Sequence, residues 1–327
     1  MYKKLYIIGN GFDIHHGIPS RYSDYRVWLE DNNVKLIDEL REIYDVDSET
    51  WWNEFELKLG SPDLGYYIDK IAEENQPDFS SDDFLDRDYN KSESQAENEI
   101  GGLVTSVRKS FADWIASFPQ PSSGKKISLD KTDALFINFN YTNTLQRLYN
   151  VSRENILFIH GNVGIDDLVL GHNKTYKELI NEFSPDLPTP PSDLKGEELY
   201  EWYEENGDGG EDYIHQTIRE ASVREVCDLR KDTDRIIKSY EDVFRKLHDV
   251  CEIYIYGWSF SPIDLPYLDK IISVIDKSNV VWKVSYYSDN DKGKANKYFQ
   301  KQYVDPIKVE YVQLKDLQII RQVNIKF

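Results

Sequence analysis

The sequence predicts an α/β protein built on a doubly wound, mostly parallel sheet of Rossmann type. Short runs are apolar at consecutive positions, as in strands that helices cover on both faces. Segments with helical spacing of apolar residues lie between these runs, and strands that alternate with helices favour right-handed βαβ units. The first run ends in a glycine-containing turn, which lets the backbone approach a ligand closely.

The elements are expected in the following order. Strands are expected at residues 5–8, 134–138, 156–159, 168–170, 253–256 and 280–286. Helices are expected at residues 20–30, 51–59, 101–118, 224–247 and 265–275. The first of these helices places Tyr25, Trp28 and Leu29 on one face, and Ser20 or Ser23 can cap its start.

Two acidic segments interrupt the alternation of strands and helices. Residues 45–99 hold 17 acidic and 4 basic residues, and residues 172–224 hold 13 and 5. Because the whole chain has a formal net charge of -20, the remainder is close to neutral. We expect one domain over residues 1–327, with an acidic, helical insertion at 45–118 and an acidic, loop-rich insertion at 172–224. A solvated surface is the simplest role for both insertions.

The composition excludes several classes of protein. With 39 Lys+Arg against 59 Asp+Glu, the chain lacks the positive surface that a nucleic-acid binder needs. No apolar run approaches the roughly 18 to 20 residues of a membrane span, and the first run is too short for a signal peptide. Cys227 and Cys251 have no CxxC spacing, which is typical of a reducing compartment. We expect a cytoplasmic protein with neither nucleic acid nor membrane as a partner.

The turn after the first strand is a candidate nucleotide-binding element. It reads Gly9-Asn10-Gly11-Phe12-Asp13. Exposed N–H groups at a strand-to-helix turn favour a phosphate, but Ile14 occupies the place of the third glycine of the dinucleotide fingerprint. Asp13 can accept from ribose hydroxyls or cap backbone amides, and the sequence leaves both roles open.

Polar residues also follow three later strands. Asn140 and Asn143 follow the second, and His160 ends the third. Gly257 and Ser259 follow the run at 253–256 in a turn that lacks the GxSxG of a serine hydrolase. Ligands of open α/β sheets bind outside the carboxyl ends of the strands, so these residues and the Gly9 turn are expected to face one crevice. A metal site on Asp13, His15 and His160 is a weaker alternative, because no HExxH or HxH spacing is present.

The chain resembles the bacterial abortive-infection AbiH family. The resemblance rests on GNGFD with His16-Gly17 and Pro19, Trp52-Asn-Glu-Phe55-Glu56, FNYTNTL, Ile159-His160-Gly161, Leu170-Gly171-His172 and YG-x-S-x-S-x-x-D at 256–264. The chain is also similar to sirtuins. Residues 9–19 resemble the pattern G-A-G-x-S-x-x-x-G-I-P, Asn140 the Asn of T-Q-N-x-D, His160 the catalytic His, and residues 257–260 the cofactor turn.

The resemblance implies a sirtuin-like fold that cleaves NAD+, with Asn140 and His160 as the catalytic residues. It implies that the nucleotide is held by Gly9, Asn10, Gly11, Phe12, Asp13, Pro19, Arg21, Asn143, Gly257 and Ser259. Two departures stand out. The sequence cannot build the four-cysteine zinc module of a sirtuin deacylase, and Thr142 stands where sirtuins have an aspartate, while Asp13 stands where they have a small hydroxyl residue.

We therefore expect an NAD+ glycohydrolase that releases nicotinamide and ADP-ribose in anti-phage defence. NAD is its substrate, and no metal is expected. With an unperturbed pKa of about 6.5, His160 would accept a proton near neutral pH. The alternative is a non-catalytic sensor of NAD or ADP-ribose, which Thr142 favours. Regulation by a homo-oligomer or by a phage-encoded or system partner protein is also expected.

Overall fold

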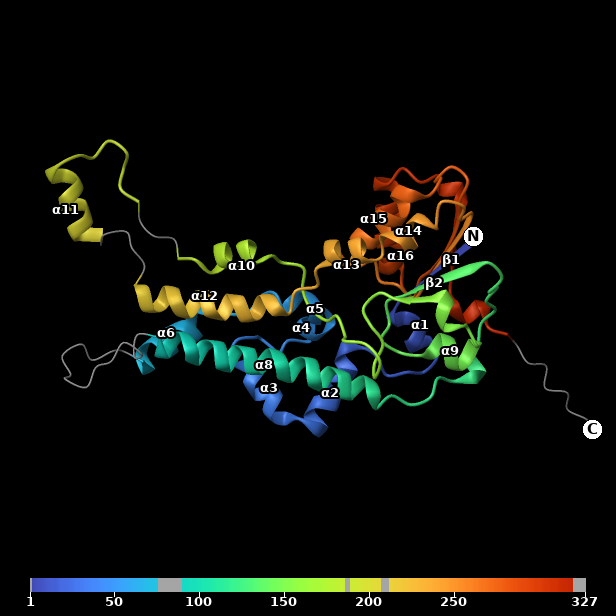
Figure 1. Cartoon of the computed structure of the whole chain (residues 1–327), viewed down its shortest axis with the longest axis horizontal. Coiled ribbons are helices and arrows are strands. Elements are labelled where there is room, and N and C mark those ends of the chain that lie inside the picture. The colour runs from blue at the N-terminus through green and yellow to red at the C-terminus, as the bar shows by residue number, and fades with distance from the viewer. Residues whose placement is uncertain (1, 76–89, 186–188, 207–211, 320–327) are drawn as a thin grey trace, which may run out of the picture. The chain divides into compact units, whose positions relative to one another are not determined.

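The computed structural model describes residues 2–75, 90–185, 189–206 and 212–319 (Figure 1). The chain forms two compact units. The first, which we call the sheet unit, comprises Met1–Asn32, Arg108–Leu170 and Lys231–Phe327. The second, which we call the helical unit, comprises Asn33–Val107 and Gly171–Arg230.

Six parallel strands form the sheet. They are β1 (Lys4–Ile8), β2 (Ala134–Asn138), β3 (Ile156–Phe158), β4 (Glu252–Tyr256), β5 (Val281–Ser285) and β6 (Val309–Val312). Their order is β3-β2-β1-β4-β5-β6. The order reverses between β1 and β4, which is the arrangement of a Rossmann-like sheet. The predicted α/β class with a doubly wound parallel sheet is confirmed.

Helices cover both faces of the sheet. The helices that lie wholly within the sheet unit are α1 (Asn10–His15), α2 (Tyr22–Asn32), α9 (Thr144–Tyr149), α13 (Thr233–Ser239), α14 (Glu241–Arg245), α15 (Leu265–Val274) and α16 (Asp289–Lys301), and all but α2 contribute to the two cores that hold the strands. Leu5 and Ile7 of β1 pack into one core with α14, α15 and α16. Tyr6 and Ile8 pack into a second core with α1 and α9. The alternation along β1 therefore supplies apolar side chains to both layers, as expected for a buried parallel strand.

Several sequence-based boundaries are wrong. No strand forms at 168–170, because the Val169 N–H donates to the His160 carbonyl at 2.9 Å and the Val169 carbonyl accepts from the Tyr141 hydroxyl. The single helix expected at 224–247 is three helices. The break follows from Asp232, whose carboxylate accepts from the Arg235 N–H and starts α13. Strand β6, which is half-exposed at the sheet edge, was not predicted.

A helix that was not predicted precedes the expected one. Asn10 already belongs to α1, which ends at His15, and the expected helix at 20–30 is α2. The expected helix at 51–59 divides into α4 (Glu49–Asn53) and α5 (Phe55–Lys58). The one expected at 101–118 is the last part of α8 (Lys91–Ala116), which contributes residues to both units.

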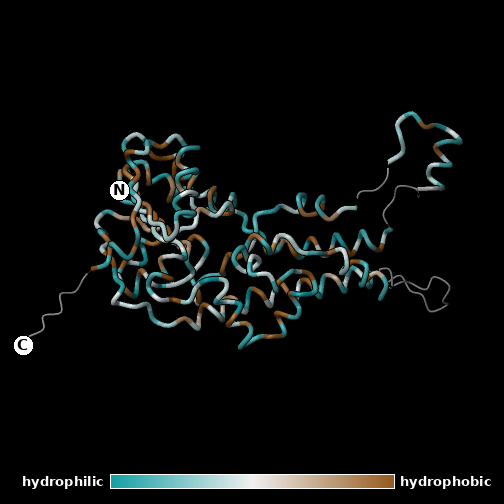
Figure 2. The backbone as a smooth tube through the Cα atoms, turned by 180° about the vertical axis from the view of Figure 1, so that it is seen from behind, coloured by the Kyte–Doolittle hydropathy of each residue, from teal (hydrophilic) through white to brown (hydrophobic). Residues whose placement is uncertain are grey.

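The helical unit holds most of the acidic residues noted in the sequence, some of which lie outside the described residues. Its other helices are α3 (Val34–Arg41), α6 (Gly65–Glu74), α10 (Tyr176–Phe183), α11 (Glu197–Asn206) and α12 (Tyr213–Asp228). Helix α12 packs against α6 and α10. Figure 2 shows hydrophilic and hydrophobic residues alternating along the helices of this unit, as amphipathic helices require.

Two of the motifs noted in the sequence serve packing in the helical unit. The indole of buried Trp52 stacks on Phe55 at 5.8 Å and donates to the Val46 carbonyl. His172 is 1% exposed, and its Nε2 pairs with the Val226 carbonyl at 3.0 Å. A Cβ at Gly60 would lie 2.6 Å from the His172 ring, so glycine at position 60 makes room for that histidine.

Within the described residues, no helix is long and apolar enough to cross a membrane.

Candidate functional site

The glycines of the first turn pack against the turn that follows β4. The Gly11 N–H donates to the Gly257 carbonyl at 2.8 Å, and the Gly257 N–H donates to the Ser285 hydroxyl at 2.7 Å. A Cβ at Gly9 would lie 2.6 Å from the Trp258 Cα, and one at Gly257 would lie 2.0 Å from the Phe12 nitrogen. Gly257 also has a φ of 67°. These glycines therefore allow two backbones to meet at the point where the strand order reverses.

Asn140 joins the same edge of the sheet. Its side-chain amide donates to the Gly9 carbonyl at 3.1 Å, and its backbone N–H donates to the Asn138 side chain. Asn140 is 6% exposed. The turns after β1, β2 and β4 are thus joined by hydrogen bonds.

His160 lies beside these turns and is almost fully buried. It is 2% exposed, and its ring packs edge-on against Phe139 and Tyr267 at 5.3 and 5.6 Å between centroids. Its Nε2 lies 3.7 Å from the Asp264 Oδ1. Burial and the Lys231 ammonium lower the pKa of His160 well below its usual value, while a hydrogen bond to the Phe139 backbone acts in the opposite direction. The expectation of an unperturbed histidine is wrong, because the environment keeps the imidazole neutral.

The Asp13 carboxylate accepts from two side-chain hydroxyls and not from the backbone amides that a helix cap would serve. It is 1% exposed, and its two carboxylate oxygens accept from the hydroxyls of Thr142 and Thr144, each at 2.6 Å. Burial raises the pKa of Asp13 to about 6, although both threonine hydrogen bonds lower it. The carboxylate therefore joins α1 to the start of α9.

The remaining residues assigned to the nucleotide are divided between core and surface. Phe12 is fully buried between His16 and Tyr149. Asn10 exchanges hydrogen bonds with Ser20, and Asn143 accepts from Asn162 at 2.6 Å. The exposed members of the set are Asn10, Pro19, Arg21 and Ser259.

The histidines of the first turn have structural partners. The His16 Nδ1 pairs with the Phe12 carbonyl and its Nε2 with the Tyr149 hydroxyl, at 2.6 and 2.7 Å. The His15 Nε2 pairs with the Lys125 carbonyl at 2.9 Å. Among the described residues, no three His, Cys, Asp or Glu side chains gather as a metal would require. The alternative of a metal on Asp13, His15 and His160 therefore receives no support.

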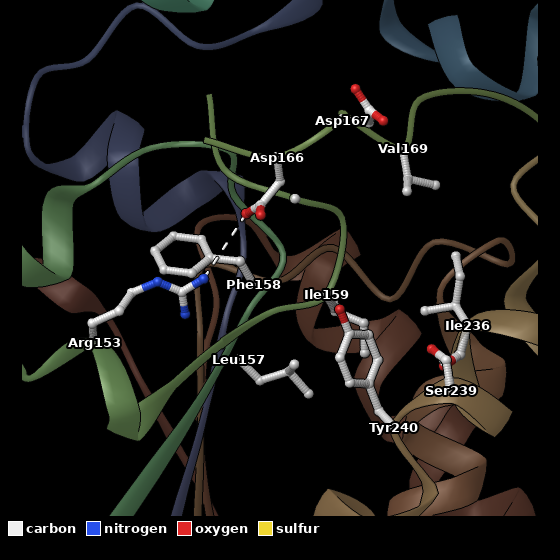
Figure 3. A pocket seen from close by; sticks show the side chains of 11 residues that line it. Arg153, Leu157, Phe158, Ile159, Asp166, Asp167, Val169, Ile236, Ser239 and Tyr240 are labelled. Carbon is white, nitrogen blue, oxygen red and sulfur yellow. Dashed lines mark hydrogen bonds and ion pairs between the residues drawn. The ribbon is translucent and has the colours of Figure 1, made fainter. Parts of the chain in front are cut away.

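A cavity of about 320 Å³ lies along the open edge of β3. Figure 3 shows Arg153 and Asp166 on one side and Tyr240 with Ser239 on the other. The Arg153 guanidinium lies 4.7 Å from the centroid of the Phe158 ring and 3.9 Å from the Asp166 carboxylate. Gly161 lines this cavity but Asn140 and His160 do not, so the cavity is distinct from the predicted catalytic pair.

Sequence reasoning missed three residues around this site, of which Lys231 and Asn162 are buried. Lys231 is 1% exposed and lies 3.5 Å from Asp264, and Asn162 is fully buried against Asn143. Asp264 is the last residue of the YG-x-S-x-S-x-x-D motif and Asn162 follows Ile159-His160-Gly161. A search around the motifs could therefore have found Asp264 and Asn162. Lys231 lies in a charged segment that contains no motif.

The fold and the site define a Rossmann-like α/β protein with glycine turns and buried polar side chains at the carboxyl ends of its strands. A family model described as bacteriophage abortive infection AbiH matches residues 5–286, and the chain belongs to this family. Membership implies a role in the abortive infection response to phage. Neither the curated proteins nor the solved structures that were compared gave a match. The similarity to sirtuins remains a prediction.

Proposed function

We propose that the chain is a cytoplasmic NAD+ glycohydrolase that releases nicotinamide and ADP-ribose during abortive infection. The observation that carries the proposal is that Asn140 donates to the Gly9 carbonyl while His160 packs on Phe139, the residue before Asn140. These residues come from three strands, and they meet where open α/β sheets bind ligands. Abortive infection gives the reaction a purpose, because loss of NAD+ stops the host cell.

The chemistry needs few groups. Nicotinamide leaves as a neutral molecule with the electron pair of the bond to the ribose, so no general acid is required. Water adds to the ribosyl carbon and loses one proton. An amide such as that of Asn140 can orient the water or a ribose hydroxyl, and a neutral His160 can accept a hydrogen bond from it. The buried site limits the access of other water to the reacting carbon.

The exchange of residues between positions 13 and 142 also supports the proposal. The similarity to sirtuins places a hydroxyl at position 13 and a carboxylate at position 142, and this chain has them reversed. The two side chains are hydrogen-bonded at 2.6 Å. One donor and one acceptor are therefore kept at the same junction, so Thr142 is no longer an argument against catalysis.

The experiment follows NAD+ in bacteria that express the chain and are challenged with phage, and in reactions of the purified protein. We expect nicotinamide and ADP-ribose to accumulate with the wild type and with His248→Ala, an exposed control histidine. Asn140→Ala and His160→Ala are expected to lose at least about 100-fold in rate. A wild type that never consumes NAD+ in infected cells, or full activity of both variants, would overturn the proposal.

A second candidate function is a sensor that binds NAD or ADP-ribose without cleaving it. Two observations favour it: His160 is 2% exposed, and the Asn140 amide is engaged by Gly9. Calorimetric binding of NAD+ without any product on chromatography would identify the sensor.

A lethal hydrolase has to be restrained until infection. We propose that a homo-oligomer or a phage-encoded or system partner protein provides this control. The exposed acidic surface of the helical unit is the candidate contact, since its charge is concentrated there. Size measurement of the purified chain with and without extract from infected cells tests this idea, and an unchanged size at every stage of infection would contradict it.

A further inference from the structure

The cavity at the open edge of β3 belongs to the sheet unit alone. It is lined by Arg153, by β3 and the segment 159–169 that follows it, and by residues 236–240. Its volume of about 320 Å³ is near the lower end of the range for small-molecule sites. Since Asn140 and His160 do not line it, a ligand of this cavity binds apart from the proposed reaction.

The edge of β3 is not open to another strand. The Ile159 N–H donates to a β2 carbonyl at 3.1 Å, so the backbone groups of Ile156 and Phe158, which alternate with it, face away from β2. The Ile156 carbonyl accepts from the Arg153 Nη1 at 2.9 Å, and the Phe158 carbonyl accepts from the Gly161 N–H at 3.3 Å. Both outward carbonyls are engaged within the chain, which favours a small molecule over an added strand.

The Arg153 guanidinium is held from one side only. Its Nη1 donates to the Ile156 carbonyl, and the group lies 4.7 Å from the centroid of the Phe158 ring. The side chain is 50% exposed. Within the part of the chain that the structure describes, its Nε and Nη2 make no hydrogen bond. These two groups form the fork that binds both oxygens of a carboxylate.

Asp166 places a carboxylate beside this guanidinium. Its Oδ2 accepts from the Asn162 N–H at 3.1 Å and lies 3.9 Å from the Arg153 Nη2, which is too far for a hydrogen bond. The Oδ1 has no hydrogen-bond partner among the described residues, and the side chain is 40% exposed. An ion pair as long and as exposed as this one contributes little to stability. Each charge therefore keeps its capacity to bind a ligand.

The opposite side of the cavity is apolar and aromatic. Figure 3 shows Tyr240 and Ile236 across from Arg153, with Leu157 between the two sides. The Tyr240 hydroxyl has no hydrogen-bond partner among the described residues. The Asp167 carboxylate points away from the other lining side chains in Figure 3. The cavity thus presents one positive and one negative group side by side, facing an apolar surface.

We propose that the cavity binds a free α-amino acid with an apolar side chain. Its carboxylate pairs with the Nε and Nη2 of Arg153, and its ammonium donates to the Asp166 Oδ1. Its side chain packs on Leu157, Ile236 and the ring of Tyr240. A simple anion leaves Asp166 unmatched and a simple cation leaves Arg153 unmatched, whereas a zwitterion satisfies both. The inference does not depend on cleavage of NAD+.

The ligand contacts a segment that is bonded to His160. Val169 lines the cavity, and its N–H donates to the His160 carbonyl at 2.9 Å. Gly161, the residue after His160, lines the cavity as well. Binding is therefore expected to slow hydrogen exchange at the Val169 amide, because the ligand restrains the segment that carries it.

The test titrates the full chain with leucine, isoleucine, valine and phenylalanine in a calorimeter. At least one of them is expected to bind at millimolar concentration or below. Arg153→Met and Asp166→Asn are each expected to weaken this binding at least about 10-fold. Arg26→Met and Glu30→Gln alter a pair at 3.0 Å on α2, in the same unit, and are expected to leave the affinity unchanged.

Ligand derivatives test the same contacts with the wild type, so the result does not depend on the folding of a variant. The amide of the amino acid lacks the carboxylate and resembles the first residue of a peptide. The N-acetyl derivative lacks the ammonium and resembles the last residue. Both are expected to bind at least about 10-fold more weakly than the free amino acid.

Four results would overturn the proposal. They are no binding of any of the four amino acids, equal binding of either derivative, binding of ribose but of no amino acid, and full affinity in folded Arg153→Met and Asp166→Asn. Loss or absence of NAD+ cleavage bears on the proposed function alone, because every measurement here reports binding.

Discussion

The Asp13 carboxylate accepts a hydrogen bond from the Thr142 hydroxyl at 2.6 Å, and this bond joins the turn after β1 to the turn after β2. A second bond from Thr144 satisfies the other oxygen. Asp13→Thr leaves both hydroxyls without their acceptor, and Thr142→Asp places a second carboxylate beside a buried one. Each single change is expected to lower the free energy of unfolding by about 2 to 4 kcal/mol.

The double variant Asp13→Thr/Thr142→Asp restores one donor and one acceptor at the junction. Urea denaturation is expected to show that the double variant loses less free energy of unfolding than the two single variants lose together. The expected difference is over about 1 kcal/mol. Strict additivity would mean that the two side chains do not act as a pair.

The pH dependence of stability reports on Asp13 separately. Its pKa is about 6 in the folded chain, against about 3.9 in an unfolded chain. Between these values the folded state binds more protons, so stability falls as pH rises through this range. The stability of the wild type relative to Asp13→Asn is expected to fall by roughly 2 kcal/mol from pH 4 to pH 7. A difference that stays constant in urea titrations at both pH values would contradict the burial of this carboxyl.

Gly257→Ala tests the contact between the two glycine turns. The added Cβ would lie 2.0 Å from the Phe12 nitrogen, at a φ of 67°. We expect a loss of more than about 3 kcal/mol, or insoluble protein. Gly293→Ala is the control, because nothing lies within 4 Å of its Cβ position in α16, and it is expected to gain about 0.5 to 1 kcal/mol. Equal melting temperatures for the two variants would argue against the contact.

Tyr149→Phe tests the structural role of His16. The Tyr149 hydroxyl contacts the His16 Nε2 at 2.7 Å and accepts from the Ile127 N–H at 3.0 Å. Its removal leaves two buried polar groups unsatisfied, which is expected to cost about 2 to 3 kcal/mol in chemical denaturation. Tyr287→Phe, at a residue that is 89% exposed, should leave stability unchanged. If the two variants behave alike, the hydroxyl contributes nothing measurable.

The sheet was predictable where local pattern and tertiary packing agree. The runs at 134–138 and 253–256 are apolar at consecutive positions, and both form buried central strands. Strand β6 is half-exposed and short, so no continuous apolar run marks it. Residues 168–170 are apolar because they cover the turn beside His160, not because they pair in the sheet. Periodicity does not distinguish these two reasons for burial.

The site was predictable in outline only. The topology rule brings Asn140, His160 and the glycine turns to one edge, and the structure places them there. Which side-chain atoms come into contact depends on packing, and the spacing of residues along the sequence does not determine that packing. Asp264 is more than 100 residues from His160 in sequence, and Lys231 follows a helix whose end was not predicted. Their encounter at a single oxygen is therefore a property of the folded chain alone.

The place of β1 in the sheet has a consequence for synthesis. Its neighbours are β2 on one side and β4 on the other, and the latter leaves the ribosome only after Tyr256 has been added. Until then β1 has one open edge, and the turn that meets Gly11 does not exist. A nascent chain therefore carries Asn140 and His160 for roughly 100 further residues without an assembled site, about 5 to 20 seconds at ordinary elongation rates. Under the proposed function, the nascent chain therefore does not consume NAD+ before its synthesis has passed β4.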